Sequence, residues 1–483
     1  MDDTGVRIDI YGPTSKISGA YPKAAVRLVT SYPVEGAHFA PSFKKGMWDG
    51  RKHLFRLTTS TFPTGLLSLV KEACELAGEV VTVVDHRTPS APQGGSYDLI
   101  GVSMTGKYDY QLEAARKAVE AKQGVLRIAT GGGKTEISCA ITRYLNLPTL
   151  FLVTTKELLY QARDRFILRL GATESEIGII GDGHWAPGSW VTIATIATLE
   201  SRLDTQECQD LLRSAEVMFM DECHRTGSDT VFEVCASCNA YYRIGLSGTP
   251  CDRTDGANLR LLGAIGDVIV DISNKLLVDI GVSAKAEIIF TKITAPVIPR
   301  KTAYSTVYKQ GVVDNPNLLG SIVDWVKIFY AQGIGTLVLC EEIAQGKAID
   351  EALWTAADGA FLPHQFIYGE DDTDLRRNAL KDFGEGRLPI LVGSTILDEG
   401  IDCKNIDALI LAGSRKSRIK TMQRLGRGLR GNKLIVVEFS NFCHDYLLRH
   451  SLQRYNDYKQ EDCFPIHQSG PNSELVKKIW NAK

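Results

Sequence analysis

Residues 125–135 read VLRIATGGGKT, an apolar run that leads into three consecutive glycines, a lysine and a threonine. The run predicts a buried β-strand, and the helical spacing of EISCAITRYL after it predicts that a helix follows at once. Glycines let a backbone turn tightly, so that its N–H groups and the amino end of the next helix can face an anion. The segment therefore predicts a phosphate-binding loop formed by Thr130, Gly131, Gly132 and Gly133.

The two residues after these glycines are suited to a nucleoside triphosphate and its metal ion. We expect Lys134 to contact the β and γ phosphates of ATP, and the Thr135 hydroxyl to ligate Mg²⁺. The strict motif has glycine where this chain has Ile128. That departure argues against a metabolic kinase, and nothing in the sequence offers a lid for a small substrate.

A second apolar run, VMFMDECH over residues 217–224, ends in acidic residues. A carboxylate at the carboxyl end of a strand beside a phosphate loop is well placed to hold Mg²⁺, which we expect of Asp221. Glu222 is the candidate that orients or deprotonates the attacking water. His224 is either a satisfied polar residue at a turn or a residue that couples this domain to another.

Apolar, β-branched runs alternate with amphipathic stretches along most of the chain, which predicts parallel sheets covered on both faces. We expect an amino-terminal module and linker (1–97), two tandem α/β domains (98–280 and 281–440) and a helical carboxyl-terminal extension (441–483). The linker is the Pro-, Gly- and Ser-rich segment 84–97. Together these features predict an α/β protein with an α+β accessory module.

Composition narrows the class of protein. The chain has 483 residues, 44% of them hydrophobic and 23% charged, as in ordinary globular proteins. Its net charge of -2 argues against a protein that coats nucleic acid by charge alone. No apolar stretch is long enough to span a membrane, so we expect no membrane association and a cytoplasmic location. The eleven cysteines, including Cys235 and Cys238 in CASC, are expected to be buried thiols.

Two local charge runs are more informative than the net charge. Residues 42–56 contain five Lys or Arg against one Asp, and residues 414–430 contain seven and no acid. In the first run we expect phosphate contacts from Lys44, Lys45, Arg51 and Lys52. Trp48 either stacks on a base, as a wedge at a junction, or anchors the core of the module.

With these motifs in place, the chain resembles the DExH-type helicases of superfamily 2, whose motor consists of two RecA-like parallel-sheet domains. The resemblance covers nearly the whole chain and implies roles in the first domain. Tyr110 and Gln111 match the adenine-recognising motif, and Ser247 and Thr249 match the motif that couples hydrolysis to movement. The segments that grip a nucleic-acid strand correspond to Thr155, Lys156 and Thr195.

The resemblance also implies roles in the second domain. Gly400 and Asp402 in GSTILDEGIDCKN would approach the nucleotide, with Ser394 and Thr395 nearer the nucleic acid. QRLGRGLR matches the arginine-finger motif, through Gln423, Arg427 and Arg430. A guanidinium there stabilises the charge that spreads over the transferred phosphoryl group.

The basic Trp-Asp-Gly segment and the following Pro-x-Gly-Leu are similar to those of phage recombination helicases of the UvsW type. This resemblance implies ATP-dependent branch migration, fork regression and unwinding of branched DNA, in recombination, repair or replication. It also implies action in the host cytoplasm if a phage encodes the chain. Translocation polarity, the preferred junction, the oligomeric state and any protein partners stay open.

Three other functions remain possible from the sequence. An RNA helicase of the DEAD type would share the motor, although DECH, SGTP and the Trp-Asp-Gly module favour DNA. A restriction subunit would use a similar motor, but the chain leaves no room for a nuclease or methyltransferase domain. A nucleotide-gated binding scaffold without hydrolysis would lack catalytic residues that this chain retains.

Overall fold

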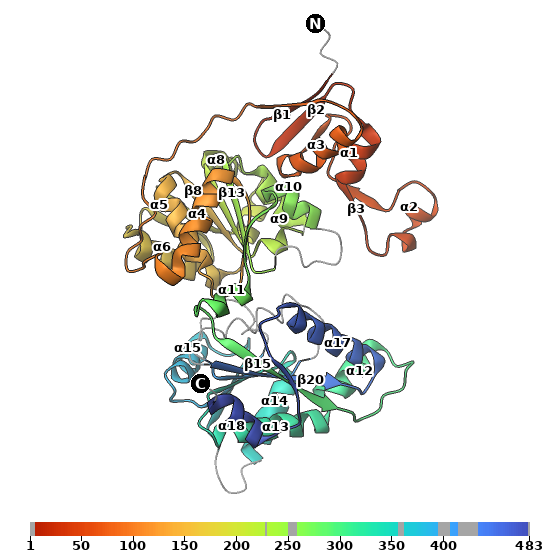
Figure 1. Ribbon diagram of the computed structural model, residues 1–483, viewed down its shortest axis with the longest axis vertical. Helices are drawn as coiled ribbons and strands as arrows, with labels where there is room; N and C mark the ends of the chain where they lie inside the picture. The colour runs from red at the N-terminus through yellow and green to blue at the C-terminus, as the bar shows by residue number, and fades with distance from the viewer. Residues whose placement is uncertain are drawn as a thin grey trace. The chain divides into compact units, whose positions relative to one another are not determined.

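A computed structural model of the chain describes residues 5–227, 229–249, 258–355, 362–394, 406–413 and 433–481 (Figure 1). These residues form two compact units, which divide near residue 272, except that the short segment Ala129–Gly132 groups with the second unit. The first unit contains the amino-terminal module and one α/β domain. The second contains another α/β domain and the carboxyl-terminal tail.

The amino-terminal module is a small mixed sheet that shares its core with two helices. Its elements are β1 Val6–Ile10, β2 Thr14–Ser18, α1 Lys23–Val29, β3 Ser31–Pro33, η1 Ala37–Phe39, α2 Pro41–Lys44, β4 Arg51–His53, β5 Thr61–Pro63, η2 Thr64–Leu66, α3 Leu67–Leu76 and β6 Val81–Asp85. Across the described residues the sheet order is β5-β2-β1-β6, and β3 pairs with β4 as a separate hairpin. Apolar side chains of β1, β2, α1 and α3 form one buried cluster.

The first α/β domain is built on a twisted, mainly parallel sheet. Its strands are β7 Gln123–Ile128, β8 Thr149–Val153, β9 Ile177–Gly181, β10 His184–Ala186, β11 Val191–Thr195, β12 Val217–Asp221, β13 Tyr242–Ser247 and β14 Val268–Ile272. In the part of the chain that is described, their order is β10-β9-β11-β8-β12-β13-β7-β14, and β10 pairs antiparallel. Since a parallel strand needs a crossover to reach its neighbour, helices alternate with the strands.

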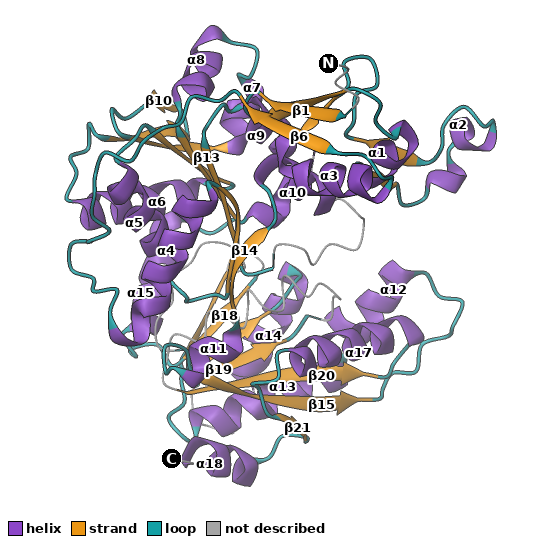
Figure 2. Cartoon of the chain, turned by 45° about the horizontal axis from the view of Figure 1, so that its top comes forward, coloured by secondary structure: helices purple, strands orange, loops and turns teal. Residues whose placement is uncertain are grey.

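The helices of this domain cover both faces of the sheet. They are η3 Gly106–Tyr108, α4 Asp109–Ala121, α5 Lys134–Leu145, α6 Lys156–Leu170, α7 Ile196–Ser201, α8 Gln206–Ser214, η4 Cys223–Gly227, α9 Asp229–Ser237 and α10 Asn258–Ile265. Figure 2 shows α4, α5 and α6 on one side of the sheet and α9 and α10 on the other. The apolar runs that begin at residues 125 and 217 form strands β7 and β12, which confirms the predicted parallel sheet.

The second α/β domain repeats this architecture. Its elements are α11 Asn274–Asp279, β15 Lys285–Ile293, α12 Tyr304–Tyr308, η5 Lys309–Val313, α13 Pro316–Tyr330, β16 Thr336–Leu339, α14 Ile343–Thr355, β17 His364–Ile367, α15 Thr373–Gly384, β18 Ile390–Gly393, β19 Ala408–Leu411, β20 Lys433–Asn441, α17 Asp445–Gln460, β21 Ile466–Gln468 and α18 Ser473–Asn481. Within the described residues the sheet is wholly parallel, in the order β17-β18-β16-β19-β20-β15-β21. The sheet has one apolar core on each face. Successive residues of a strand point into opposite cores, as Ile288 and Ile289 of β15 do.

The amino-terminal module is packed tightly against the first α/β domain. Leu259 and Leu262 of α10 pack against the apolar cluster of the module. A side chain at Gly65 would lie 1.9 Å from the carbonyl oxygen of Leu262, so only glycine fits there. The linker is also held, because the ring of Tyr97 stacks on that of Tyr144 with centroids 4.2 Å apart. The module is therefore fixed to this domain.

The carboxyl-terminal extension contains the helix that its spacing predicts. In α17, Arg454 donates to Glu438 of β20 at 2.9 Å and the Tyr458 hydroxyl donates to the same carboxylate at 3.0 Å. All three residues are buried, so this part of the helix is structural. In the described parts of the chain, no helix has both the length and the apolar character that crossing a membrane requires.

Candidate nucleotide site

The predicted motifs of the first α/β domain converge at one edge of its sheet. Neighbouring strands in the order β11-β8-β12-β13-β7 are all parallel, so their carboxyl ends meet at the same edge. The residues that follow or end these strands are Thr195 on β11, Thr155 after β8, Asp221 on β12, Ser247 on β13 and the phosphate loop after β7. Ligands of open α/β sheets bind at this edge.

The glycines of the phosphate loop adopt backbone conformations that other residues avoid. Gly131 and Gly133 have φ angles of 84° and 86°, in the left-handed region. Helix α5 begins with Lys134 directly after Gly133, so its amino end faces the loop. A Cβ atom at Gly133 would lie 2.2 Å from Nε2 of Gln111. The loop and the predicted adenine-recognising glutamine are therefore in contact, and Tyr110 accepts a hydrogen bond from that glutamine at 3.3 Å.

Lys134 and Glu222 form the central ion pair of the site. Lys134 Nζ lies 2.8 Å from Glu222 Oε1, and the two side chains are 19% and 24% exposed. Glu222 has a φ of 49°, a strained value for a residue with a side chain. Its backbone N–H donates to Oδ1 of Asp221 at 3.0 Å. This backbone turn directs Glu222 toward the phosphate loop while Asp221 stays at the end of its strand.

A polar chain leads from Glu222 to the predicted coupling motif. His224 Nδ1 lies 3.3 Å from Glu222 Oε2 and 3.1 Å from the Ser247 hydroxyl. That hydroxyl also accepts a hydrogen bond from the backbone N–H of Thr249 at 3.1 Å. His224, Ser247 and Thr249 are all buried. Contacts thus run without a break from Glu222, beside Lys134, to the backbone of Thr249.

The electrostatics of the ion pair and of Asp221 differ. Burial alone would lower the pKa of the Lys134 ammonium, but the Glu222 and Asp221 carboxylates raise it above its ordinary value. Burial opposes ionisation of Glu222, yet Lys134 and His224 hold its pKa well below the usual range. Burial raises the pKa of Asp221 to about 6. The ionised form of Asp221 is therefore less stabilised by its neighbours than that of Glu222, so a cation bound nearby would stabilise Asp221 more.

Oxygen donors at this edge fit a magnesium ion that is shared with a triphosphate. Asp221 offers a carboxylate and Thr135, in the first turn of α5, offers a hydroxyl, and Mg²⁺ prefers such hard ligands. Among the described residues, no group of three or more His, Cys, Asp or Glu is arranged to hold a metal ion. The phosphates and water would have to complete the coordination, as is usual for Mg²⁺ with nucleotides.

The candidate strand-gripping residues have defined local roles. The Thr155 hydroxyl caps α6 by accepting from the Leu158 N–H at 3.3 Å. Lys156 is exposed, with its Nζ 3.7 Å from Asp182 Oδ1. Thr195 is buried and donates to the Thr198 hydroxyl at 2.8 Å. Of these three candidates, Lys156 is the one whose side chain solvent reaches freely.

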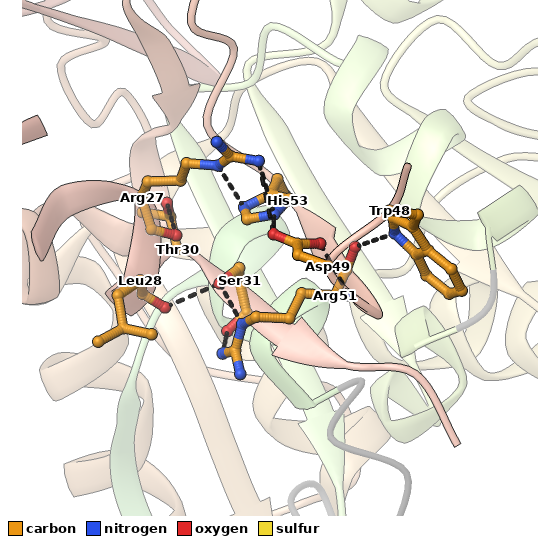
Figure 3. A network of polar contacts seen from close by, with 8 residues as sticks. All are labelled: Arg27, Leu28, Thr30, Ser31, Trp48, Asp49, Arg51 and His53. Carbon is orange, nitrogen blue, oxygen red and sulfur yellow. Dashed lines mark hydrogen bonds and ion pairs between the residues drawn. The ribbon is translucent and has the colours of Figure 1, made fainter. Parts of the chain in front are cut away.

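The candidate DNA contacts in the amino-terminal module separate into two groups. Lys44 and Lys45 are exposed. By contrast, the guanidinium of Arg51 donates to the hydroxyl and carbonyl of Ser31 at 2.8 and 2.7 Å (Figure 3). Trp48 is half-buried and its indole N–H donates to the Arg51 carbonyl at 2.8 Å. The geometry thus favours the anchoring role for Trp48 and gives Arg51 an internal one.

Lys52 also has an intramolecular partner, which the sequence did not indicate. Its Nζ lies 2.5 Å from Oδ1 of Asp229, the first residue of α9, and the same carboxylate binds Arg260 of α10. These two cations lower the pKa of Asp229. Sequence spacing alone gives no signal for a pair whose members are so far apart in the chain.

The candidate residues of the second domain are only partly described. Ser394 follows β18, is buried, and donates through its backbone N–H to Ile367 at 3.2 Å. The other candidates lie outside the described residues, and they are Thr395, Gly400, Asp402, Gln423, Arg427 and Arg430.

Family models match both α/β domains. The model described as type III restriction enzyme, res subunit, matches residues 106–252, and the model described as helicase conserved C-terminal domain matches residues 323–432. The first match contains the phosphate loop, the DECH segment and the SGTP motif. With the two parallel sheets, these matches define the class: the chain has the two domains of an ATP-dependent DNA helicase and resembles the helicases of superfamily 2.

Individual relatives narrow the resemblance. The chain is 23% identical over 471 residues to ATP-dependent DNA helicase uvsW of Enterobacteria phage T4, covering 89% of this chain and 92% of that protein. It is 28% identical over 338 residues to putative DNA 3'-5' helicase Rad25 of Haloarcula marismortui, covering 68% of this chain and 51% of the relative. The structure of Mycobacterium smegmatis helicase Lhr bound to ssDNA and AMP-PNP shares the fold at 18% identity and a TM-score of 0.52, over 74% of this chain and 49% of that one.

Proposed function

We propose that this chain uses ATP hydrolysis to remodel branched DNA by branch migration, fork regression and unwinding. The observation that carries the proposal is the contact chain from Lys134 through Glu222 and His224 to Ser247 at the carboxyl edge of the sheet. This chain joins a phosphate-contacting lysine to a motif suited to coupling. Similarity to UvsW over nearly the whole chain supports DNA as the substrate and branched DNA as its form.

In this proposal, ATP replaces Glu222 as the partner of Lys134. The lysine turns to the β and γ phosphates, and Glu222 is released to orient the attacking water and take its proton. Thr135 and Asp221 would hold Mg²⁺, which neutralises phosphate charge when bound. We propose that Gln111, whose amide lies beside Gly133 of the phosphate loop, recognises the adenine.

Release of Glu222 also changes the environment of His224. With the nucleotide bound, the His224 ring keeps Ser247 as a partner while its contact with Glu222 weakens. The SGTP segment would then shift with the state of the nucleotide. We propose that Thr155, Lys156, Thr195, Ser394 and Thr395 hold the DNA strand that this movement displaces.

The second domain completes the proposed cycle. We propose that Gly400, Asp402 and Gln423 contribute to nucleotide binding, and that Arg427 or Arg430 stabilises the transferred phosphoryl group. We also propose that the amino-terminal module and linker end at residue 97, the first α/β domain at residue 280 and the second at residue 440. If a phage encodes the chain, we propose that the protein acts in the cytoplasm of the host cell.

The experiment that tests the proposed function compares strand products. Purified protein, ATP and Mg²⁺ are incubated with a labelled four-way junction, a replication fork, plain duplex DNA and matched RNA, and the products are separated by native gel. The proposal expects conversion of the junction and fork in the presence of ATP and no comparable conversion of RNA. Equal activity on RNA, or no conversion of either branched DNA, contradicts it.

A further inference from the structure

The segment that joins β3 to β4, residues 34–50, is an ordered projection of the amino-terminal module, which we call the tip loop. At its base the Val34 N–H donates to the Gly50 carbonyl at 2.9 Å, next to the β3–β4 pairing. Inside the loop, the backbone N–H groups of Lys45 and Met47 donate to Pro41 and Ser42 at 3.0 and 2.9 Å. The loop therefore holds a defined shape before it meets any partner.

Side chains at the base of the tip loop fix its direction. Asp49 Oδ2 lies 2.7 Å from Nε2 of His53 and 3.5 Å from the guanidinium of Arg27 (Figure 3). Figure 3 also shows Arg51 turned toward Ser31, and the Trp48 indole directed at the Arg51 carbonyl. The polar side chains near the base are thus used within the module.

The far part of the tip loop exposes apolar side chains between cations. Phe39 and Met47 are each 72% exposed, whereas Phe43 is 39% exposed. The Phe43 ring rests on Gly50, where an added Cβ would lie 2.9 Å from the ring. Phe43 thus supports the loop, while Phe39 and Met47 project from it. Large apolar side chains that a short, ordered loop holds out to solvent are candidates for a binding surface.

The surrounding charge indicates what this surface binds. Lys44 and Lys45 are exposed, and among the described residues neither forms an ion pair. The tip loop contains two acids: Asp49 is engaged by His53 and Arg27, and the exposed Glu35 lies at the start of the loop, next to Val34 at its base. A partner with flat apolar faces bordered by anions matches this pattern, and the bases and phosphates of DNA have that chemistry.

The base of the tip loop is also tied to the helicase domain. Lys52 of β4 binds Asp229, and Arg260 binds the same carboxylate while its guanidinium lies 5.6 Å from the centre of the Tyr32 ring on β3. Asp229 starts the helix that follows the segment η4, which carries His224. The tip loop and the DECH segment are therefore connected through side-chain contacts. A force applied to the loop would be transmitted to the first α/β domain.

From these observations we propose that the tip loop contacts the DNA branch point, where Phe39 and Met47 stack against the unpaired or terminal base pair and Lys44 and Lys45 bind the flanking phosphates. The inference rests on the proposed function, because it assigns the element that touches the branch. It replaces Trp48 with Phe39 and Met47 as the residues that meet the bases.

The test uses a four-way junction with 2-aminopurine at the branch point, and protein without nucleotide. The wild-type protein should change the fluorescence of the branch-point base. The double variant Phe39→Ser, Met47→Ser should leave the fluorescence as in free DNA and weaken junction binding about tenfold, since stacking on the bases is lost. Leu76→Ser, which changes an 82% exposed residue elsewhere in the module, serves as the matched control and should behave like wild type.

The lysines are tested separately through the salt dependence of binding. In the variant Lys44→Ala, Lys45→Ala, the slope of log affinity against log salt should fall by about 2, because each lost phosphate contact removes one unit or slightly less. The branch-point fluorescence change at saturation should persist. An unchanged slope would contradict the assignment of these lysines.

Two results would overturn the assignment of Phe39 and Met47. One is a double variant that binds the junction and changes the fluorescence as the wild type does. The other is loss of a dimer, seen by sedimentation, with junction affinity unchanged, which would make the tip loop a contact between copies. The fluorescence test uses no ATP and is independent of remodelling. A protein that changes the branch-point fluorescence but converts no branched DNA when ATP is added would contradict the proposed function and leave the assignment of the tip loop in place.

Discussion

Glu222→Gln should bind ATP more tightly than the wild type and hydrolyse it far more slowly. The Lys134–Glu222 pair, at 2.8 Å with both side chains at least three-quarters buried, must open before Lys134 can contact phosphates. A partly buried hydrogen bond to a charged group contributes about 1.5–3 kcal/mol, and glutamine keeps only a weaker bond between the ammonium and a neutral amide oxygen. Removing about 1.4 kcal/mol of this competition raises the affinity for ATP about tenfold.

The same substitution removes the proposed base, and such groups contribute about 10²–10⁴-fold to a rate. Binding of a fluorescent ATP analogue measures the affinity, and single-turnover phosphate release measures hydrolysis. Glu120→Gln changes an exposed glutamate on α4 and is the matched control. Hydrolysis close to the wild-type rate would contradict the role of Glu222 as the base. An unchanged affinity for ATP would contradict its competition with phosphate for Lys134.

Further outcomes follow from other contacts. Ser247→Ala should lower the number of base pairs unwound per ATP, measured on a fork, because His224 loses its buried partner; an unchanged ratio contradicts the coupling role. Arg243→Met should lower the free energy of unfolding by about 3 kcal/mol or more, measured in urea, because buried carbonyls of Cys235 and Cys238 lose a charged donor; wild-type stability would contradict this. Burial raises the pKa of Cys235 to about 12, so iodoacetamide at pH 8 should leave it unmodified in the folded protein, and mass spectrometry showing rapid alkylation would contradict this.

The strands were predictable from sequence because both faces of each sheet are buried. Such strands read as continuous apolar runs, as in VMFMD on β12, and they do not depend on distant residues for recognition. Strand β14 is harder to predict, because its residues Val268 and Ile269 are partly exposed at the edge of the sheet. A half-exposed edge strand lacks the continuous apolar signal.

The candidate site was predictable where one short segment supplies the whole geometry. The phosphate loop and the DECH segment each combine a strand end with its functional residues, so their types and spacing are sufficient. The strained backbone of Glu222 and its contact with Lys134 depend on how two segments pack, which spacing does not reveal. The arginine-finger residues Arg427 and Arg430 stay a prediction.

In the amino-terminal module the sequence could not show which Lys and Arg side chains remain available to bind DNA. Five Lys or Arg within residues 42–56 look equivalent as a charge run. Only the folded hairpin separates Arg51 and Lys52, which bind Ser31 and Asp229, from the exposed Lys44 and Lys45. A charge run predicts phosphate contact in general, and long-range pairing decides which members remain available.

The most direct test of the central claim is the rate of ATP hydrolysis by the wild-type protein with and without a DNA four-way junction, measured as released phosphate. Lys134, Glu222, His224 and Ser247 form a continuous contact chain, so we expect slow hydrolysis by the protein alone and a marked increase when the junction is added. Hydrolysis that does not respond to the junction, or the complete absence of hydrolysis, would show that the protein is not an ATP-driven DNA motor.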